Sequence, residues 1–208
     1  MKRKSRFLEA ALLLIVFAFL FSSCIGLENV EKIKFNILIE EEKGPQEGYL
    51  SLQVIPKGED KFQGTVDFKL GDEEFSTTFT TEEGSLENAI TPLIFSNPSL
   101  AGILGVVSSA QLMLTPFLFT GEELKEGSMW REKNEEGQET ETTITSSETR
   151  FGKEALWIEV KTDGIVVIQM LAEKETYLPL VLDIRDETQL ESGQQRIYLE
   201  VEEIVWQE

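Results

Sequence analysis

Apolar and polar residues alternate along most of the chain, with the two-residue period of a half-buried β-strand. In residues 34–40, for example, Phe35, Ile37 and Ile39 fall on one face. Asp163-Gly164 is the clearest hairpin signal, because both residues tolerate the positive φ of a type I′ turn. The pattern therefore predicts an antiparallel meander interrupted once. The expected strands are 34–40, 49–54, 62–70, 75–80, 128–133, 139–150, 156–160, 165–172, 180–184 and 197–206.

The interruption is a segment, residues 88–121, that contains no charged residue. Three prolines divide it, and its longest continuous piece, residues 100–114, has partly helical apolar spacing with further apolar groups on the other side. A helix that is apolar nearly all round lies in a protein core or in lipid. Its glycines, serines and prolines make a membrane span a poor fit at this length. We expect helices that are buried or that line an apolar pocket, with a membrane-dipping loop as the alternative.

The first 23 residues have the pattern of an export signal. Four basic residues among the first six precede an unbroken apolar run over residues 10–21. That run is shorter than the about 20 residues a transmembrane helix needs, and it has the size of a signal-peptide core. Small residues, Ser22 and Ser23, follow it.

The segment Phe21-Ser22-Ser23-Cys24 resembles the lipobox of prokaryotic lipoproteins. The resemblance implies cleavage before Cys24 and attachment of lipid to Cys24. The alternative is an uncleaved signal anchor with a free cysteine. Both interpretations tether the domain to the cell membrane on its extracytoplasmic face. The expected organisation is a signal in 1–23, an anchor and linker in 24–33, and one β-rich domain in 34–208 with a helical insertion at 86–121.

Composition excludes several kinds of chemistry. The 208 residues include no histidine and one cysteine, so catalytic triads with histidine, histidine-ligated zinc and a disulfide framework are all absent. The formal net charge is −19; removing residues 1–23 takes away four basic groups and one acid, which leaves 15 basic against 37 acidic residues and a net charge of −22. Such a surface repels nucleic acid and anionic headgroups. We therefore expect no nucleic-acid partner.

Carboxylate clusters are the remaining candidates for catalysis or metal binding. They lie at 40–42, 72–74, 122–123 and 202–203. None has the alternating spacing of a calcium loop, and adjacent acids on a strand point to opposite faces. We interpret them as solvated strand ends and turns. We expect no metal, no cofactor and no enzymatic activity.

The run from Trp130 to Val205 is similar to the C-terminal half of lipoprotein-carrier half-barrels of the LolA, LolB and LppX type. The shared features are a Thr-rich strand, Gly152 with Leu156-Trp157-Ile158, and a second strand that ends in a Leu-Pro turn at residues 173–180. The similarity covers about a third of the chain. It implies a curved antiparallel half-barrel whose concave face is plugged by helices, with acyl chains entering between plug and sheet.

We therefore expect a mainly β fold, a curved sheet or half-barrel of about ten strands with a central helical plug. The expected function is that of a membrane-anchored lipoprotein that binds a hydrophobic, lipid-like ligand between plug and sheet. The alternative is a non-catalytic structural or interaction subunit of a cell-envelope assembly with a filled core, and the sequence indicates no particular protein partner. A carboxylate-based hydrolase is the third class. The expected pocket residues are Leu100, Ile103, Leu104, Val107, Leu112, Met113 and Phe117.

Overall fold

The computed structural model of the chain describes residues 30–57, 61–81, 97–112, 124–133, 137–185 and 194–206. The predicted signal, Cys24, most of the insertion at 86–121, and the pocket candidates Met113 and Phe117 lie outside these ranges.

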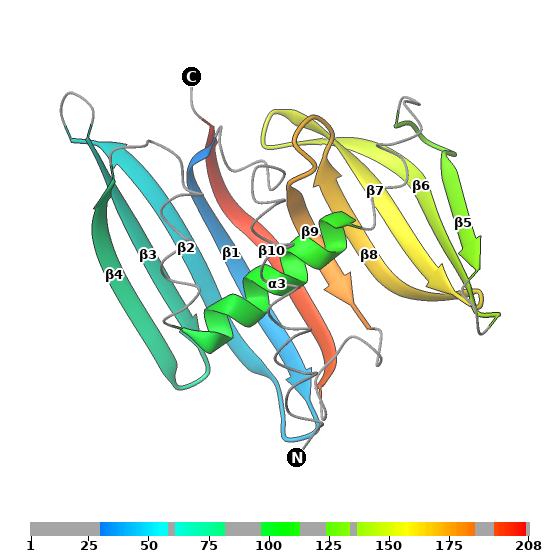
Figure 1. Cartoon of the computed structure of the whole chain (residues 1–208), viewed down its shortest axis with the longest axis horizontal. Helices are drawn as coiled ribbons and strands as arrows, with labels where there is room; N and C mark the ends of the chain where they lie inside the picture. The colour runs from blue at the N-terminus through cyan, green and yellow to red at the C-terminus, as the bar shows by residue number, and fades with distance from the viewer. Residues whose placement is uncertain are drawn as a thin grey trace, which may run out of the picture.

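The described strands form one ten-stranded antiparallel sheet in the order β4-β3-β2-β1-β10-β9-β8-β7-β6-β5 (Figure 1). The predicted mainly β fold with about ten antiparallel strands is therefore confirmed. The strands are β1 (Val30–Glu41), β2 (Gln46–Pro56), β3 (Phe62–Leu70), β4 (Glu73–Thr81), β5 (Met129–Lys133), β6 (Glu139–Arg150), β7 (Lys153–Thr162), β8 (Ile165–Glu173), β9 (Pro179–Ile184) and β10 (Gln194–Trp206).

Two meanders make up this sheet, and their joint lies at its centre. Strands β1 to β4 run outward to one edge, and β10 back to β5 run outward to the other. The joint is the antiparallel pair β1–β10, in which Phe35 lies opposite Val201 and Ile37 opposite Leu199. Strand β1 begins at Val30, four residues before the predicted start at residue 34. A register irregularity between Val30 and Lys32 breaks the two-residue period there, which explains the difference.

The buried side chains of the sheet gather mainly on one face. Residues directly opposite each other in an antiparallel pair project to the same face, so the register connects the buried positions of successive strands. We call this the inner face. Apolar residues on it include Ile33, Phe35, Ile37, Ile39, Leu50, Leu52, Val54, Val66, Phe68, Phe75, Phe79, Ile144, Leu156, Ile158, Val160, Ile168, Met170, Leu182, Ile184, Ile197, Leu199 and Val201.

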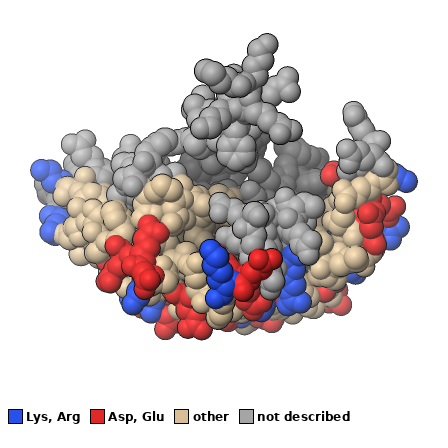
Figure 2. All heavy atoms as spheres, turned by 90° about the horizontal axis from the view of Figure 1, so that it is seen from below, with Lys and Arg blue, Asp and Glu red and all other residues tan. Residues whose placement is uncertain are grey.

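One described helix, α3 (Pro98–Leu112), runs across the inner face from the side of β4 towards β8 (Figure 1). Figure 2 shows the described part of the chain as a curved shell, with Lys, Arg, Asp and Glu side chains gathered on its convex side. The inner face is therefore the concave one. We call the opposite, charged side the outer face.

Strand β8 is apolar on both faces, as its sequence predicts. Met170 is buried on the inner face and Leu171 on the outer face. The β6–β7 turn also reaches β10, which is not its neighbour in the sheet. Arg150 pairs with Glu200, and Trp206 Nε1 donates to the carbonyl oxygen of Phe151 at 3.2 Å. The end of this hairpin therefore connects the second meander to the central strand β10 by contacts outside the sheet ladder.

Candidate functional site

The inner face is an apolar floor that spans most of the sheet. Phe68, Leu50 and Leu52 are each at most 1% exposed. Across β1 the floor continues through Phe35 to Val201 on β10. A surface of this composition can bind acyl chains or other apolar groups by removing their surface from water. Such binding needs no charge or hydrogen bond.

Helix α3 contributes two of the predicted pocket residues to this floor. Ile103 and Val107 are 4% and 5% exposed, and their four-residue spacing puts them on one face of the helix. Leu100, Leu104 and Leu112 lie within α3, but their side chains are outside the described part of the structure. The structure thus brings two of the seven candidates into the apolar core.

The side of α3 opposite Ile103 and Val107 carries two glycines. Gly102 and Gly105 are exposed, and a Cβ built on either would meet no atom within 4 Å. Each glycine inside a helix costs about 1 kcal/mol relative to alanine. The helix also has no acidic residue in its first turn and no basic residue in its last, so no side chain of its own offsets the helix dipole there. Its helical state therefore depends on contacts with the sheet.

The beginning of α3 is attached to the edge strand β4 by hydrogen bonds. Asn97 precedes Pro98 at the N-cap position, and its carbonyl oxygen accepts from the Ala101 amide at 3.0 Å. Asn97 Nδ2 donates to Glu73 Oε1 at 3.1 Å, and Ser99 Oγ donates to Glu73 Oε2 at 2.6 Å. The Glu73 carboxylate also faces the positive end of the helix dipole. Glu73 is therefore a clamp for α3.

Sequence reasoning missed this clamp. The Asn-Pro pair that opens α3 is a recognisable start signal, since asparagine favours the N-cap and proline favours the first helical position. Nothing in the sequence connects it to Glu73, which precedes it by 24 residues.

The outer face carries the strongest electrostatic cluster among the described residues. Arg196 binds the Asp183 carboxylate through two hydrogen bonds, of 2.7 and 2.8 Å, and Arg185 adds a third of 2.8 Å. Arg196 also reaches Glu40 at 3.2 Å. Asp183 is only 7% exposed. Burial by itself would raise the pKa of Asp183, but the bonds from Arg196 and Arg185 outweigh it and hold the pKa below its usual value.

A small depression adjoins this cluster. Its volume is about 140 Å³, and it is lined by Val166, Val167, Ile168, Gln169, Asp183 and Arg185. Ligand pockets usually measure about 300 to 1,000 Å³. The polar groups of the depression are also bonded to one another, since Asp183 is held by Arg185 and Gln169 Nε2 donates to Glu159 at 3.0 Å. We therefore assign this cluster a structural role.

The described ranges also lack two other kinds of site. They contain no group of three or more His, Cys, Asp or Glu side chains placed to hold a metal ion. No helix within them is both long and apolar enough to cross a bilayer.

Replacing Asp183 tests the outer-face cluster. Asp183→Asn should lower the free energy of unfolding by about 3 kcal/mol near neutral pH, because two guanidinium groups lose their carboxylate. The folded-state pKa of Asp183 lies below the unfolded value of about 3.9, so its contribution is complete above that value and is lost as the pH falls through the lower folded-state pKa. Urea unfolding at a series of pH values should show the difference between wild type and variant shrinking only in acid.

The matched control is Asp72→Asn, in the exposed β3–β4 turn, which should change little at any pH. A wild-type to Asp183→Asn difference that stays constant down to strong acid would contradict the role of the ionised carboxylate.

Replacing Glu73 tests the clamp on α3. Glu73→Ala removes the acceptor for Asn97 and Ser99, so the amides of the first turns of α3 should exchange with solvent faster, on the order of tenfold. Glu74→Ala, which alters the adjacent carboxylate on the other face of β4, should leave α3 unchanged. Hydrogen exchange read by mass spectrometry measures both, and equal effects of the two variants would rule out a specific clamp.

The likeness of this chain to known proteins is weak. No protein-family model matches the chain, and no curated protein matches it. Among solved structures, the crystal structure of MucB aligns with 92% of this chain and 59% of its own length, at 9% sequence identity and a TM-score of 0.36. This chain thus spans little more than half of MucB, and a likeness at this level identifies neither a fold family nor a function.

Proposed function

We propose that the chain is a membrane-anchored extracytoplasmic lipoprotein that binds an apolar, lipid-like ligand between α3 and the inner face of the sheet. The observation that carries this proposal is an apolar concave face crossed by a helix with two exposed glycines and no charged side chain in its first or last turn. Such a cover can move away without breaking any strand pairing of the sheet. The proposed role is binding and not catalysis.

The energetics favour an elongated apolar ligand. Each square ångström of acyl-chain surface removed from water contributes about 25 cal/mol, so a chain lying along the floor needs no polar contact to bind. The apolar residues of α3, Ile103 and Val107, would then exchange contacts with the sheet for contacts with the ligand. In this mechanism α3 is the plug of a half-barrel, as the similarity to lipoprotein carriers implies.

A second candidate function follows from the close packing of the floor. Ile103, Val107 and Phe68 are all nearly fully buried without any ligand. A core filled in this way needs no guest, as in ordinary protein interiors. The second candidate is therefore a non-catalytic structural or interaction subunit of a cell-envelope assembly.

Ligand uptake distinguishes the two functions. The chain from Ile25 onward, purified without the N-terminal apolar run, should bind a fluorescent fatty acid with saturation and should carry lipid in an organic extract. Val107→Gln replaces an apolar contact with the ligand by an amide that an acyl chain cannot hydrogen-bond, and it should weaken probe binding at least tenfold.

Gly105→Gln is the matched control, since it makes the same side chain on the bare side of α3, where a Cβ meets no neighbour. It should bind the probe like wild type. If wild type takes up no probe and yields no lipid, the ligand-binding function is wrong and the filled-core function stands.

The anchor is tested separately. In a bacterial host, Cys24→Ser should abolish incorporation of a labelled fatty acid into the chain, because cysteine supplies the thiol that carries lipid. Ser23→Ala should retain the label, because it keeps a small residue before the cleavage point. Labelled Cys24→Ser protein would show that lipid is attached elsewhere.

A further inference from the structure

Strand β4 forms one edge of the sheet, and among the described residues it pairs only with β3. An edge strand presents a row of backbone N–H and C=O groups that can pair with another strand. Natural edge strands usually discourage such pairing with lysine, proline, bulges or short length. Strand β4 has nine residues in unbroken register with β3 and contains neither lysine, arginine nor proline.

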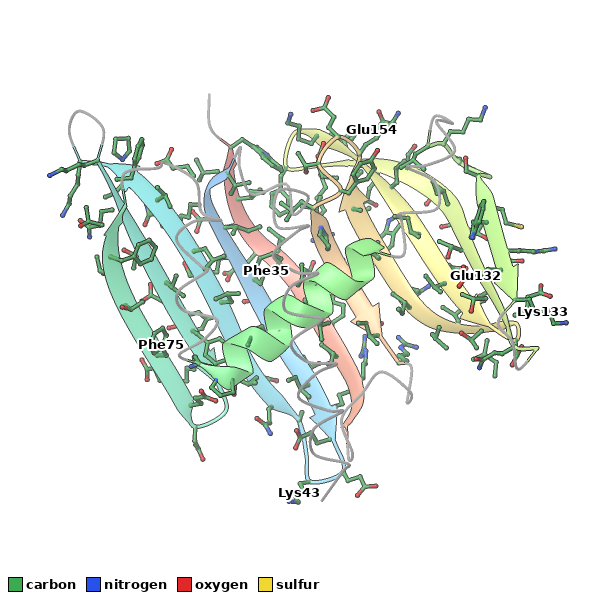
Figure 3. All side chains as sticks on the ribbon, in the orientation of Figure 1. Phe35, Lys43, Phe75, Glu132, Lys133 and Glu154 are labelled. Carbon is green, nitrogen blue, oxygen red and sulfur yellow. The ribbon has the colours of Figure 1, made fainter. Side chains whose placement is uncertain are left out.

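The other edge of the sheet, β5, differs in length and in its basic residues. It has five residues, and its sequence Met-Trp-Arg-Glu-Lys ends in three charges. Pairing two copies of β5 about its centre would place Arg131 opposite Arg131. Figure 3 shows the contrast, with Phe75 on β4 at one edge and Glu132 and Lys133 on β5 at the other. Charge therefore protects the last three residues of the β5 edge, whereas on the β4 edge residues 75–81 carry no charge.

We propose that β4 pairs with β4 of a second copy of this chain, antiparallel about a two-fold axis at Thr77. The sequence of β4, Glu-Glu-Phe-Ser-Thr-Thr-Phe-Thr-Thr, is nearly symmetric about that residue. In this register Phe75 lies opposite Phe79 of the second copy, and Glu73 and Glu74 lie opposite threonines. No carboxylate faces another, and two aromatic pairs form across the new junction.

Alternative registers lose these matches. An antiparallel pair with two-fold symmetry keeps inner-face residues opposite inner-face residues, so the axis must coincide with a residue position. Moving the axis to Ser76 places Phe79 opposite Glu73, and moving it to Thr78 places both phenylalanines opposite threonines. Only the axis at Thr77 gives every residue of β4 a partner and pairs Phe75 with Phe79.

The proposed dimer extends the architecture of one copy. The axis is perpendicular to the sheet, so the two inner faces lie on the same side and join through Phe75 and Phe79. Both phenylalanines already pack against the core of their own copy and are only partly buried. A second copy would bury them further, which is the driving force of association. The dimer does not depend on whether the inner face binds a ligand.

Cysteine cross-linking tests the register. In the full chain carrying Cys24→Ser, solubilised in mild detergent, Thr77→Cys places two thiols opposite each other on the axis, within reach of a disulfide. Thr80→Cys is the matched control, because its two copies would lie about 20 Å apart at about 3.4 Å per residue. Oxidation should yield at least ten times more linked dimer for Thr77→Cys than for Thr80→Cys on a non-reducing gel.

Charge substitution tests the same interface without covalent chemistry. Thr77→Lys sets two ammonium groups opposite each other on the axis and should weaken dimerisation at least tenfold in sedimentation velocity. Thr80→Lys places an ammonium opposite Glu74 of the second copy and should leave dimerisation equal or stronger. Circular dichroism confirms that each variant is folded.

The proposal would be overturned by a wild-type chain that stays monomeric at all concentrations, by equal cross-linking at Thr77 and Thr80, or by equal weakening by the two lysine substitutions. A complex that is not a dimer and that gives no Thr77 cross-link would also overturn the proposal, because the β4 edge would then bind a different partner.

Discussion

The pairing of β1 with β10 is the constraint on which the rest of the structure depends. It joins residues 30–41 to residues 194–206 and turns two separate meanders into one sheet. Closing so long a stretch of chain costs conformational entropy, although this cost grows only slowly with length. The apolar inner-face pairs, such as Phe35 with Val201 and Ile37 with Leu199, offset it by burial. Strands β1 and β10, the first and last strands of the sheet in chain order, therefore lie side by side at the centre of the concave floor.

The two faces of this sheet differ in the side chains that they carry. The inner face removes apolar surface from water, while the outer face accommodates the excess of acid in a chain of net charge −19. Basic residues on the outer face stand next to acids on adjacent strands, as Lys32 with Glu203 and Lys34 with Glu202. Exposed pairs of this kind contribute little each, about 0 to 1 kcal/mol. The buried Asp183 differs, because its desolvation must be compensated by Arg196 and Arg185.

The sheet and the helix that crosses its inner face are held in place by different kinds of contact. The sheet is held by backbone pairing along every strand, whereas the described contacts of α3 are the packing of Ile103, Val106 and Val107 and the Glu73 clamp. These contacts join side chains and not strand backbones, so α3 can separate from the sheet without breaking any strand pairing. This difference connects the fold to the proposed binding function. It also places the start of α3 at the same edge strand, β4, that we propose as the dimer interface.

The sequence by itself determined which residues share a face. Side chains alternate along a strand, so the two-residue period was enough to predict the inner-face residues Phe35, Ile37 and Ile39, and the lack of charge was enough to predict burial of Ile103 and Val107. Only the tertiary structure decided that β1 pairs with β10, that Glu73 holds the start of α3, and that Asp183 meets Arg196. Those contacts join residues far apart in the chain, and a local period carries no information about distant partners.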